Sequence, residues 1–359
     1  MKGMTALNLK RYFALLLVFV VITGLTACSF FSSAPSPSPA AASPSASPSP
    51  SSASRTTVNL TLLKGPTGVG AAKLLSDNDA GLTENSYKVT VSSDNSEVAA
   101  RLTSGQTDIA ALATNVAANL FNKSGGDIKL LALNTLGVLY ILERGGTNVN
   151  SVTDLKGKTL YATGQGANPE FVLNFLLEQN GLVPGTDVKI VWKTSDEVSA
   201  LMLTGDAEYC MLPVPAATAL ELKTVSSDAA SKIIPVLDLT EEWDNATDSS
   251  SLIMGCVVVR REFAEENPQA VSDFLTEYAS SIQYVKDHPD EAAVLVARYG
   301  ITPSEAIAKA AIPDCNLICV SGKDMRDAIQ GYYEVLFSVD PASIGGSIPD
   351  DSFYFFVQK

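Results

Sequence analysis

Two glycine-rich turns are the segments of this sequence best suited to hold a small molecule. The first, Gly65–Gly70, reads Gly-Pro-Thr-Gly-Val-Gly, and the second, Thr163–Gly166, reads Thr-Gly-Gln-Gly. Free backbone N–H groups and the hydroxyls of Thr67 and Thr163 could face a ligand there. The alternative is that both are turns that need glycine for their backbone conformation. No Gly-Lys-Ser/Thr follows the first turn, so it is not a phosphate loop.

Single residues at the ends of predicted strands carry further candidate binding chemistry. Lys64 could pair with an anion or simply be solvated. Trp192 could stack on a planar ligand or pack in the core. Thr114 and Asn115 could bind a ligand, although both residue types also cap helix N-termini with their side chains. The sequence leaves these alternatives open.

Catalytic and metal-binding chemistry finds little support. The only histidine, His288, lies between Asp287 and Pro289, where one predicted helix ends and the next begins, so we expect a surface residue. No serine, cysteine or carboxylate has a visible partner base nearby, and one histidine does not complete a Cys-Cys-His zinc set. We therefore expect no enzyme, no catalytic residue, no metal and no cofactor.

Cys28 has a different chemistry, which the residues before it define. Three basic residues precede an apolar run of about 14 residues, Tyr12–Leu25, and Cys28 directly follows Leu-Thr-Ala. This pattern predicts a signal peptide over residues 1–27, because the run is shorter than the roughly 20 residues of a membrane-spanning helix. Leu-Thr-Ala-Cys resembles the lipobox of bacterial lipoproteins, which implies lipidation of Cys28. The alternative is an ordinary signal peptide that is cut near Ala27.

Residues 28–56 are predicted to form a tether. From Ser29 to Ser54 the chain is almost entirely Ser, Pro and Ala, so it cannot bury enough apolar surface to offset its conformational entropy. Repeated Ser-Pro pairs favour extended polyproline II, at about 3 Å per residue. Such a segment would hold a folded domain away from a membrane without fixing its orientation.

The remaining chain of about 305 residues is acidic. The formal charge of −14 becomes about −17 without the signal peptide, and no Lys/Arg cluster interrupts it, which argues against a nucleic-acid partner. Cys210 and Cys256 lie in apolar runs and are predicted to be buried. Cys315 and Cys319, four residues apart, are left either free or bridged.

An internal repeat organises this body. Glu97–Leu120 and Glu197–Leu220, 100 positions apart, share seven identical residues. Each copy predicts a short amphipathic helix that ends at a glycine, an apolar strand, a turn and a second helix. Apolar strands between helices are typical of a parallel sheet covered on both faces. The repeat therefore predicts two α/β lobes of similar construction.

Each predicted lobe begins with a strand, a glycine-rich turn and a helix. Further strands are predicted at 58–63, 87–92, 127–133, 159–162, 187–192, 232–237 and 252–259, and the last helices at 267–287, 289–299, 303–311 and 323–337. In open α/β sheets ligands bind at the carboxyl ends of strands, where helix N-termini point. We therefore expect a ligand cleft between the lobes.

These features, with two further phrases, resemble a known family. The phrases are Ser-Gly-Gln-Thr-Asp-Ile-Ala at 104–110 and Asp-Leu-Lys-Gly-Lys at 154–158. Together with the lipobox, the tether and the turn after Lys64, they resemble solute-binding lipoproteins of ABC importers. The nearest group in pattern includes receptors for alkanesulfonates, taurine, nitrate and thiamine-pyrimidine precursors. The resemblance covers nearly all of residues 57–359 and is specific for fold rather than for ligand.

The resemblance implies a two-lobed, type II periplasmic-binding-protein-like fold whose chain crosses twice between the lobes. Lobe I would hold residues 57–138 and 252–359, and lobe II residues 139–251. The crossings would lie at 137–143 and 248–257.

The resemblance also implies ligand contacts in the turns that face the cleft. They are Thr67, Gly68, Thr114, Asn115, Asn134, Thr135, Thr163, Gly164, Pro213 and Pro215. None of these turns carries an arginine, and the cations beside them are Lys64 and Lys193. The site therefore suits a small neutral or singly charged molecule, planar and heteroaromatic if Trp192 or Tyr161 faces it.

The implied protein is an extracytoplasmic receptor. It would be a monomer, bound to the bacterial cell membrane through its lipid anchor only, that delivers a small molecule to an ABC permease. One alternative is a ligand-sensing lipoprotein, and another is an enzyme similar to fungal pyrimidine synthases. The lipobox argues against the enzyme. Neighbouring genes for a permease and an ATPase would separate receptor from sensor.

Substitution of the lipidated thiol tests the anchoring. Cys28→Ser removes the sulfur that would carry the lipid, so we expect the variant to leave the membrane fraction or to remain unprocessed. Membrane fractionation and the mass of the intact chain measure both outcomes, with Ser32→Ala in the tether as control. A Cys28→Ser variant that stays membrane-bound at its normal mass contradicts the lipoprotein interpretation.

Overall fold

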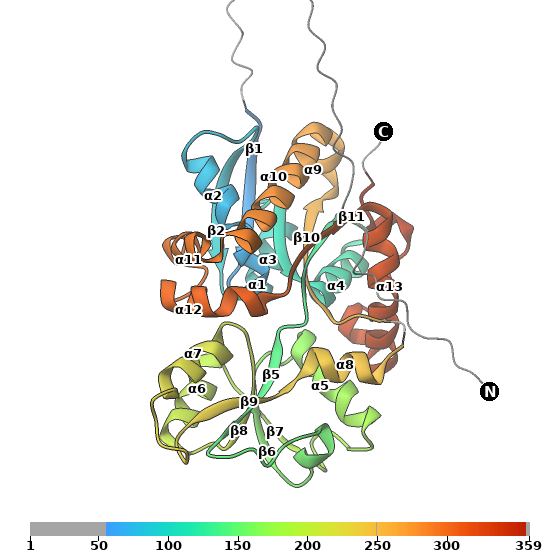
Figure 1. The fold of residues 1–359 in the computed structure, drawn as a ribbon. Helices are drawn as coiled ribbons and strands as arrows, with labels where there is room; N and C mark the ends of the chain where they lie inside the picture. Colours follow the sequence, from blue (N-terminus) through green and yellow to red (C-terminus); the bar gives the residue numbers. More distant parts are fainter. Residues whose placement is uncertain (1–54, 249, 357–359) are drawn as a thin grey trace, which may run out of the picture. The chain divides into compact units, whose positions relative to one another are not determined.

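The computed structural model describes residues 55–248 and 250–356, which fold into two α/β lobes (Figure 1). The predicted signal peptide, Cys28 and nearly all of the tether lie outside the described residues. Lobe I is built on a six-stranded sheet and lobe II on a five-stranded sheet. The prediction of two α/β lobes is therefore confirmed.

The sheet of lobe I has the strand order β11-β4-β10-β3-β1-β2. Its strands are β1 (Thr57–Leu63), β2 (Ser86–Ser92), β3 (Ile109–Ala113), β4 (Ile128–Leu136), β10 (Ile253–Arg260) and β11 (Leu317–Ser321). β1 pairs in parallel with β2 and β3, whereas β10 runs antiparallel between β3 and β4. Every residue of β3 and all but the last of β10 are buried, because helices cover both faces.

Lobe II repeats this topology in the order β7-β6-β8-β5-β9. Its strands are β5 (Leu139–Arg144), β6 (Thr159–Ala162), β7 (Lys189–Trp192), β8 (Tyr209–Pro213) and β9 (Ile233–Asp238). β6 is parallel to β7 and β8, and β5 is antiparallel to β8 and β9. The sheets are thus mixed rather than wholly parallel, because β5 and β10 each enter their sheet from the opposite lobe.

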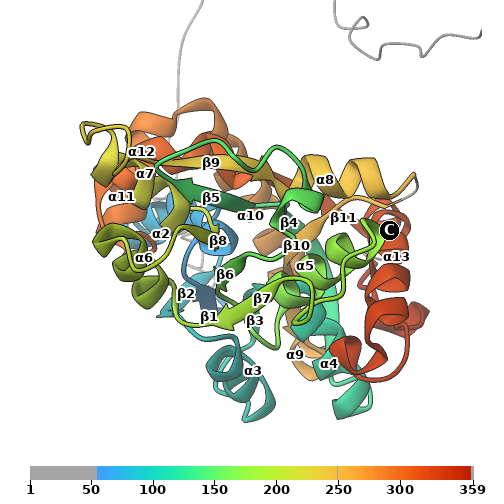
Figure 2. The ribbon, with the colours of Figure 1, turned by 90° about the horizontal axis from the view of Figure 1, so that it is seen from below.

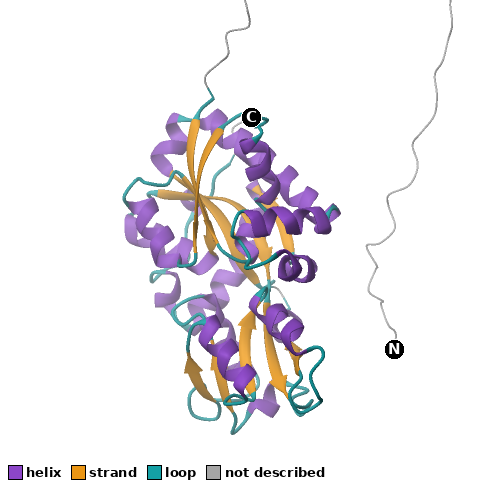
Figure 3. Ribbon diagram, turned by 90° about the vertical axis from the view of Figure 1, so that its left-hand side faces the viewer, coloured by secondary structure: helices purple, strands orange, loops and turns teal. Residues whose placement is uncertain are grey.

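Helices lie on both faces of the two sheets (Figure 3). In lobe I they are α1 (Pro66–Val69), α2 (Ala72–Asp79), α3 (Asn95–Thr103), α4 (Thr114–Ser124), α9 (Arg261–Glu266), α10 (Pro268–Asp287), α11 (Pro289–Arg298), α12 (Glu305–Ala311) and α13 (Gly322–Val339). In lobe II they are α5 (Asn168–Gln179), α6 (Ser195–Thr204), α7 (Ala216–Thr224) and α8 (Leu239–Ala246). Local caps fix several starts: Asp94 caps α3, and Thr194 with Glu197 forms a capping box at α6.

The two copies of the sequence repeat form equivalent units, α3-β3-α4 and α6-β8-α7. A glycine with positive φ follows each first helix, 72° at Gly105 and 85° at Gly205. An arginine covers each glycine: a Cβ added at Gly105 would lie 3.2 Å from Arg260 Nη1, and one at Gly205 would lie 3.3 Å from Arg144 Nε. Arg260 ends β10 and Arg144 ends β5, so the equivalence extends to side chains outside the repeat.

The two crossings between the lobes pass side by side. The chain leaves lobe I through residues 137–138, between β4 and β5, and returns between α8 and β10. Both crossings are shorter than predicted, because β5 and β10 pair within their sheets along their whole length. A Cβ added at Gly137 would lie 2.9 Å from Leu252 Cδ2, so glycine allows the first crossing to touch the second.

A buried aromatic cluster joins the lobes beside these crossings. The ring of Trp243 on α8 lies 4.8 Å from that of Phe175 on α5 and 5.4 Å from that of Tyr332 on α13, measured between centroids. Trp243 and Tyr332 are fully buried, and the indole N–H donates to the carbonyl of Ser250 at 3.1 Å. Helix α13 of lobe I therefore packs against helices of lobe II, as Figures 1 and 2 both show.

The structure contains elements that were not predicted, among them a helix and a strand. Helix α8, capped by Asp238, lies where no helix was predicted, because its apolar residues are few and only Leu239 and Trp243 are buried. Strand β11 follows Asn316, whose φ of 43° turns the chain sharply into it. Among the helices described, none combines the length and apolarity needed to cross a membrane.

Truncation of the central tryptophan tests the aromatic cluster. Trp243→Ala removes a fully buried side chain, so we expect the free energy of unfolding to fall by about 3–5 kcal/mol. Trp192→Ala is the matched control: the side chain of Trp192 is only half-buried, and its removal should cost clearly less. Urea denaturation measures both values. Equal losses would contradict the central role of Trp243.

Candidate functional site

The carboxyl ends of the parallel strands of both sheets lie at the boundary between the lobes. β1 ends just before Lys64 and β3 just before Thr114, while in lobe II β8 ends at Pro213. A Cβ added at Gly65 would lie 3.6 Å from Pro215 Cδ, so the turn after β1 contacts the turn after β8. Two cavities with lining residues from both lobes lie at this boundary.

The first of these, here called the lysine cavity, has a volume of about 650 Å³. Lobe I contributes Lys64, Gly65, Pro66, Ile301, Pro303 and Ile307. Lobe II contributes Ser195, Asp196, Ser199, Ala200, Leu203, Pro213, Val214, Pro215, Ala216, Ala219, Leu220 and Lys223. Most of these side chains are apolar, so the lysine cavity suits a ligand with an apolar body and few polar groups.

The charges of the lysine cavity are unevenly balanced. Lys64 and Lys223 are exposed, and within the described chain neither has a carboxylate in ion-pair range. Asp196, in the first turn of α6, is the one acidic residue that lines this cavity. Lys193, by contrast, has a carboxylate partner: its Nζ lies 3.8 Å from Glu197 Oε1. One free cation from each lobe thus borders the same apolar space, which favours a singly charged anion over a cation.

The second cavity, here called the asparagine cavity, has a volume of about 490 Å³ and a polar lining. Its residues are Ser93, Asp94, Asn95, Ser96, Asn115, Val116, Asn119, Gly164, Gln165, Gly166, Ala167, Phe171, Asp340, Ala342 and Ser343. Hydrogen bonds from Ser96 lower the pKa of the Asp94 carboxyl, so it is charged at neutral pH. With two carboxylates and no basic residue in its lining, this cavity is less suited to an anion.

Several predicted ligand contacts are engaged in internal hydrogen bonds instead. Asn134 Nδ2 donates to the carbonyl of Thr67 at 3.0 Å and to the hydroxyl of Tyr278 at 2.9 Å. Thr135 Oγ1 donates to Asn134 Oδ1 at 3.0 Å, and Thr114 Oγ1 donates to the carbonyl of Ile253 at 2.6 Å. All of these side chains are buried. Neither cavity is lined by Thr67, Thr114, Asn134 or Thr135.

The predicted glycines have local structural reasons for being glycine. A Cβ added at Gly68 would lie 2.4 Å from the carbonyl oxygen of Leu63, and one at Gly164 would lie 2.5 Å from Pro169 Cγ. Gly164 also has a φ of 87°. Of the two glycines, only Gly164 lines one of the two cavities.

The remaining predicted contacts divide between the two cavities and the core. Lys64, Pro213 and Pro215 line the lysine cavity, and Asn115 lines the asparagine cavity. Thr163 Oγ1 accepts a hydrogen bond from Ser195 Oγ at 3.4 Å. Trp192 is half-buried and packs against the apolar core at the edge strand β7. The structure therefore brings Lys64, Pro213 and Pro215 together and separates them from the others.

Lys223 and Asn168 lie at the boundary and are among the residues that were not predicted as contacts. Lys223 lies in the last turn of α7, a position typical of a solvated lysine. Asn168 is the first residue of α5 and is buried against lobe I. No pattern in the sequence marks either residue, because their roles depend on side chains from the opposite lobe.

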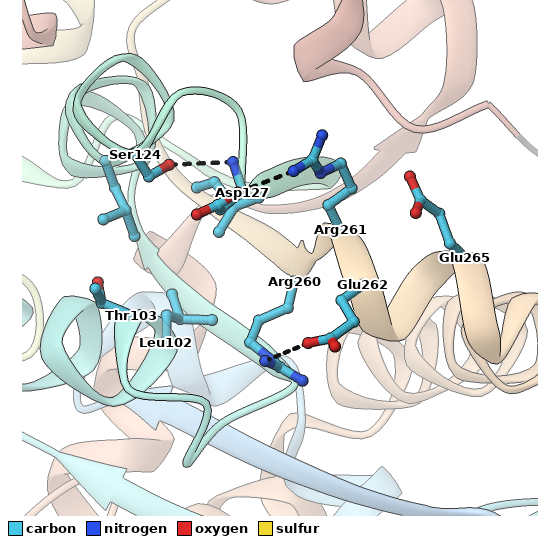
Figure 4. A pocket seen from close by; sticks show the side chains of 10 residues that line it. Leu102, Thr103, Ser124, Asp127, Arg260, Arg261, Glu262 and Glu265 are labelled. Carbon is cyan, nitrogen blue, oxygen red and sulfur yellow. Dashed lines mark hydrogen bonds and ion pairs between the residues drawn. The ribbon is translucent and has the colours of Figure 1, made fainter.

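A third cavity of about 490 Å³ lies within lobe I, at the ends of β4 and β10 (Figure 4). Its arginines are paired: Arg261 with Asp127 at 3.0 Å, and Arg260 with Glu262 at 3.1 Å. It borders the start of β4 rather than the carboxyl ends of parallel strands, where α/β sheets bind ligands. We therefore do not regard it as the ligand site.

The four described cysteines are buried or half-buried, and the histidine lies on the surface. Burial raises the pKa of the thiols of Cys210 and Cys256, and together with the charge of Asp314 it raises that of Cys315 to about 12. Cys315 and Cys319 are both free, and His288 is exposed between α10 and α11. Within the described ranges, no group of three His, Cys, Asp or Glu side chains is placed to hold a metal.

Comparison with protein families identifies one match. Residues 140–292, less than half of the chain, match the family model described as NMT1/THI5 like. This range begins in β5 and ends in α11, so it includes most of lobe II and part of lobe I. A search of curated proteins found no match.

Solved structures share the fold over most of the chain. An ABC transporter protein from Parabacteroides distasonis has 25% identity and a TM-score of 0.68, covering 84% of this chain and 100% of its own. The aliphatic sulphonate binding protein SsuA from Escherichia coli has 14% identity and a TM-score of 0.67, covering 85% and 94%. The nitrate-binding protein NrtA from Synechocystis has 14% identity and a TM-score of 0.52, covering 73% and 69%.

The predicted resemblance to substrate-binding proteins of ABC importers is thus confirmed, and the chain has the two-lobed α/β fold of periplasmic binding proteins.

Substitution of Gly68 by alanine tests whether this glycine is needed for packing or for ligand binding. In Gly68→Ala the new Cβ meets the carbonyl oxygen of Leu63, so we expect the free energy of unfolding without ligand to fall by about 1–3 kcal/mol. Urea denaturation measures the loss, with Thr67→Ser as the neighbouring control. Unchanged stability with weakened ligand binding would instead identify Gly68 as a ligand contact.

Proposed function

We propose that this chain is the solute-binding receptor of an ABC importer, that it captures a small molecule between its lobes, and that it is not an enzyme. The observation that carries the proposal is the lysine cavity, which both lobes line at the carboxyl ends of β1 and β8. Proteins of the same fold support it, since two of them are named for binding sulphonate or nitrate.

The proposed ligand is a small neutral or singly negative molecule with an apolar body. Lys64 of lobe I and Lys223 of lobe II provide two cations, and Ser195 and Ser199 provide hydroxyls around an apolar lining. Pro213 and Pro215 contribute apolar surface to the same cavity. A dianion is less suited, because Asp196 borders the same space.

The proposed architecture keeps the boundaries read from the sequence. Lobe I comprises residues 57–138 and 252–359, and lobe II residues 139–251. A signal peptide over residues 1–27 and a tether over 28–56, lipidated at Cys28, would hold this monomer on the extracytoplasmic face of the membrane. The sensor alternative differs only in the partner, so co-purification with a permease would separate the two functions.

A thermal-shift panel identifies the ligand class. A ligand at 100 times its Kd adds about 2.7 kcal/mol of stability, which corresponds to a shift on the order of 5–10 °C. We suggest alkanesulfonates, nitrate, pyrimidines, thiamine precursors, flavins and amino acids. A panel in which nothing raises the melting temperature contradicts the receptor proposal.

Charge variants then test the lysine cavity with the ligand so found. Because a hydrogen bond to a charged group contributes about 1.5–3 kcal/mol, Lys64→Ala and Lys223→Ala should each weaken binding of an anion by about tenfold or more. Lys286→Ala, on the exposed face of α10, is the matched control and should leave the affinity unchanged. An anion whose affinity is the same in all three variants binds elsewhere.

A further inference from the structure

Two asparagines meet across the lobe boundary at the N-termini of helices α4 and α5. The backbone N–H of Asn115 donates to Asn168 Oδ1 at 3.3 Å, and the backbone N–H of Asn168 donates to Asn115 Oδ1 at 3.2 Å. Asn115 is 2% and Asn168 1% exposed. Each side chain thus accepts a hydrogen bond from the first turn of the helix in the opposite lobe.

Neither helix has a cap from its own lobe. The residues before α4 and α5 are Ala113 and Ala167, which offer no side-chain acceptor to the first-turn N–H groups. A buried N–H without an acceptor is costly, and a capping side chain that accepts from it stabilises the start of the helix. The asparagine pair therefore supplies in each lobe a cap that the lobe itself lacks.

Further hydrogen bonds fix the amide of Asn168 in lobe I. Asn168 Nδ2 donates to Thr114 Oγ1 at 2.9 Å and to the carbonyl of Met254, on β10, at 2.8 Å. The hydroxyl of Tyr333, on α13, donates to the carbonyl of Thr114 at 3.0 Å. This hydrogen bond fixes the start of α4, which carries Thr114. Both donors and the acceptor of the Asn168 side chain are thereby used, all of them toward lobe I.

The asparagine pair and the lysine cavity involve different helices of lobe II. α5 contacts α13 beside the aromatic cluster, whereas α6 and α7 line the lysine cavity, and α7 contacts α12. Figures 1 and 2 both place α5, α8 and α13 on one side and α6, α7 and α12 on the other. The capped contact and the unpaired lysines therefore lie at opposite ends of the boundary.

We propose that Asn115 and Asn168 form a clasp that fastens the lobes at the α5 end without ligand, so that the lobes part at the lysine cavity. The clasp occupies the two helix N-termini that would otherwise attract an anion, which leaves the charge of a ligand to Lys64 and Lys223. For binding, which rests on the proposed receptor function, the two asparagines are positioning residues. They hold the lobes together at one end of the boundary, so less ordering is needed when ligand enters.

Hydrogen exchange of the ligand-free, full-length chain tests the clasp. In the unsubstituted protein we expect the peptides containing the Asn115 and Asn168 amides to exchange slowly. Asn168→Ala, in lobe II, should speed exchange at Asn115 in lobe I at least tenfold, and Asn115→Ala should do the same at Asn168. Because each effect appears in the opposite lobe, a purely local role of either side chain would not produce it. If one variant fails to fold, the other gives the reciprocal reading.

Asn85→Ala is the matched control. Asn85 is also 1% exposed, and its Nδ2 donates to Tyr87 Oη at 3.1 Å and to the carbonyl of Ala270 at 2.8 Å, all within lobe I. It should leave exchange at Asn115 and Asn168 unchanged. Fast exchange of both amides in the unsubstituted protein, or no transfer of the effect between lobes, would overturn the clasp.

The consequence for binding is measured separately. With a ligand from the thermal-shift panel, we expect Asn168→Ala to raise the Kd by about tenfold, mainly through faster dissociation. An unchanged Kd overturns the positioning role. If no ligand is found, the receptor proposal fails while the exchange experiment still decides whether the clasp exists.

Discussion

The return strand β10 is the constraint on which this structure depends. It lies between β3 and β4 in the middle of the sheet of lobe I and is buried almost throughout, yet it enters from lobe II. Without β10 the sheet has no pairing between β3 and β4, so lobe I cannot complete its core until the chain has passed through lobe II. β5 has the corresponding place in the other sheet, between β8 and β9. Each lobe is therefore completed by a strand that the other delivers.

This exchange of strands brings both crossings to one part of the boundary between the lobes. The crossings run in contact at Gly137 and Leu252, and the cluster of Trp243, Phe175 and Tyr332 covers them with fully or largely buried rings. Apolar contacts of this kind resist separation because parting would expose large rings to water. We therefore infer that a rotation of the lobes would open the part of the boundary that has no such packing. The lysine cavity lies there, and a cation from each lobe borders it without a carboxylate partner in the described chain.

The polar groups of the boundary follow one rule, which is that burial requires a partner. Asn134 and Thr135 are buried and hydrogen-bonded within lobe I, so their side chains stabilise the protein whether or not a ligand is present. Thr114 is buried as well, and its hydroxyl donates within lobe I and accepts from Asn168 of lobe II. Asn115 and Asn168 find their partners in opposite lobes. Only side chains that remain exposed, such as Lys64 and Lys223, keep their charge available. Burial thus distinguishes polar residues that, in the sequence, are equally plausible ligand contacts.

The sequence by itself determined the local elements and the two-lobed plan. The repeat at Glu97 and Glu197, the glycines 105 and 205 after the helices and the apolar strands act over a few residues, and local patterns of this kind are legible in a chain. The short crossings, helix α8 and the antiparallel insertion of β10 were decided by pairing partners far along the chain. The site followed the same division: Lys64 could be named because it follows a strand, whereas Lys223 and Asn168 could not. Their surroundings come from the opposite lobe, and only the tertiary structure brings the two sides together.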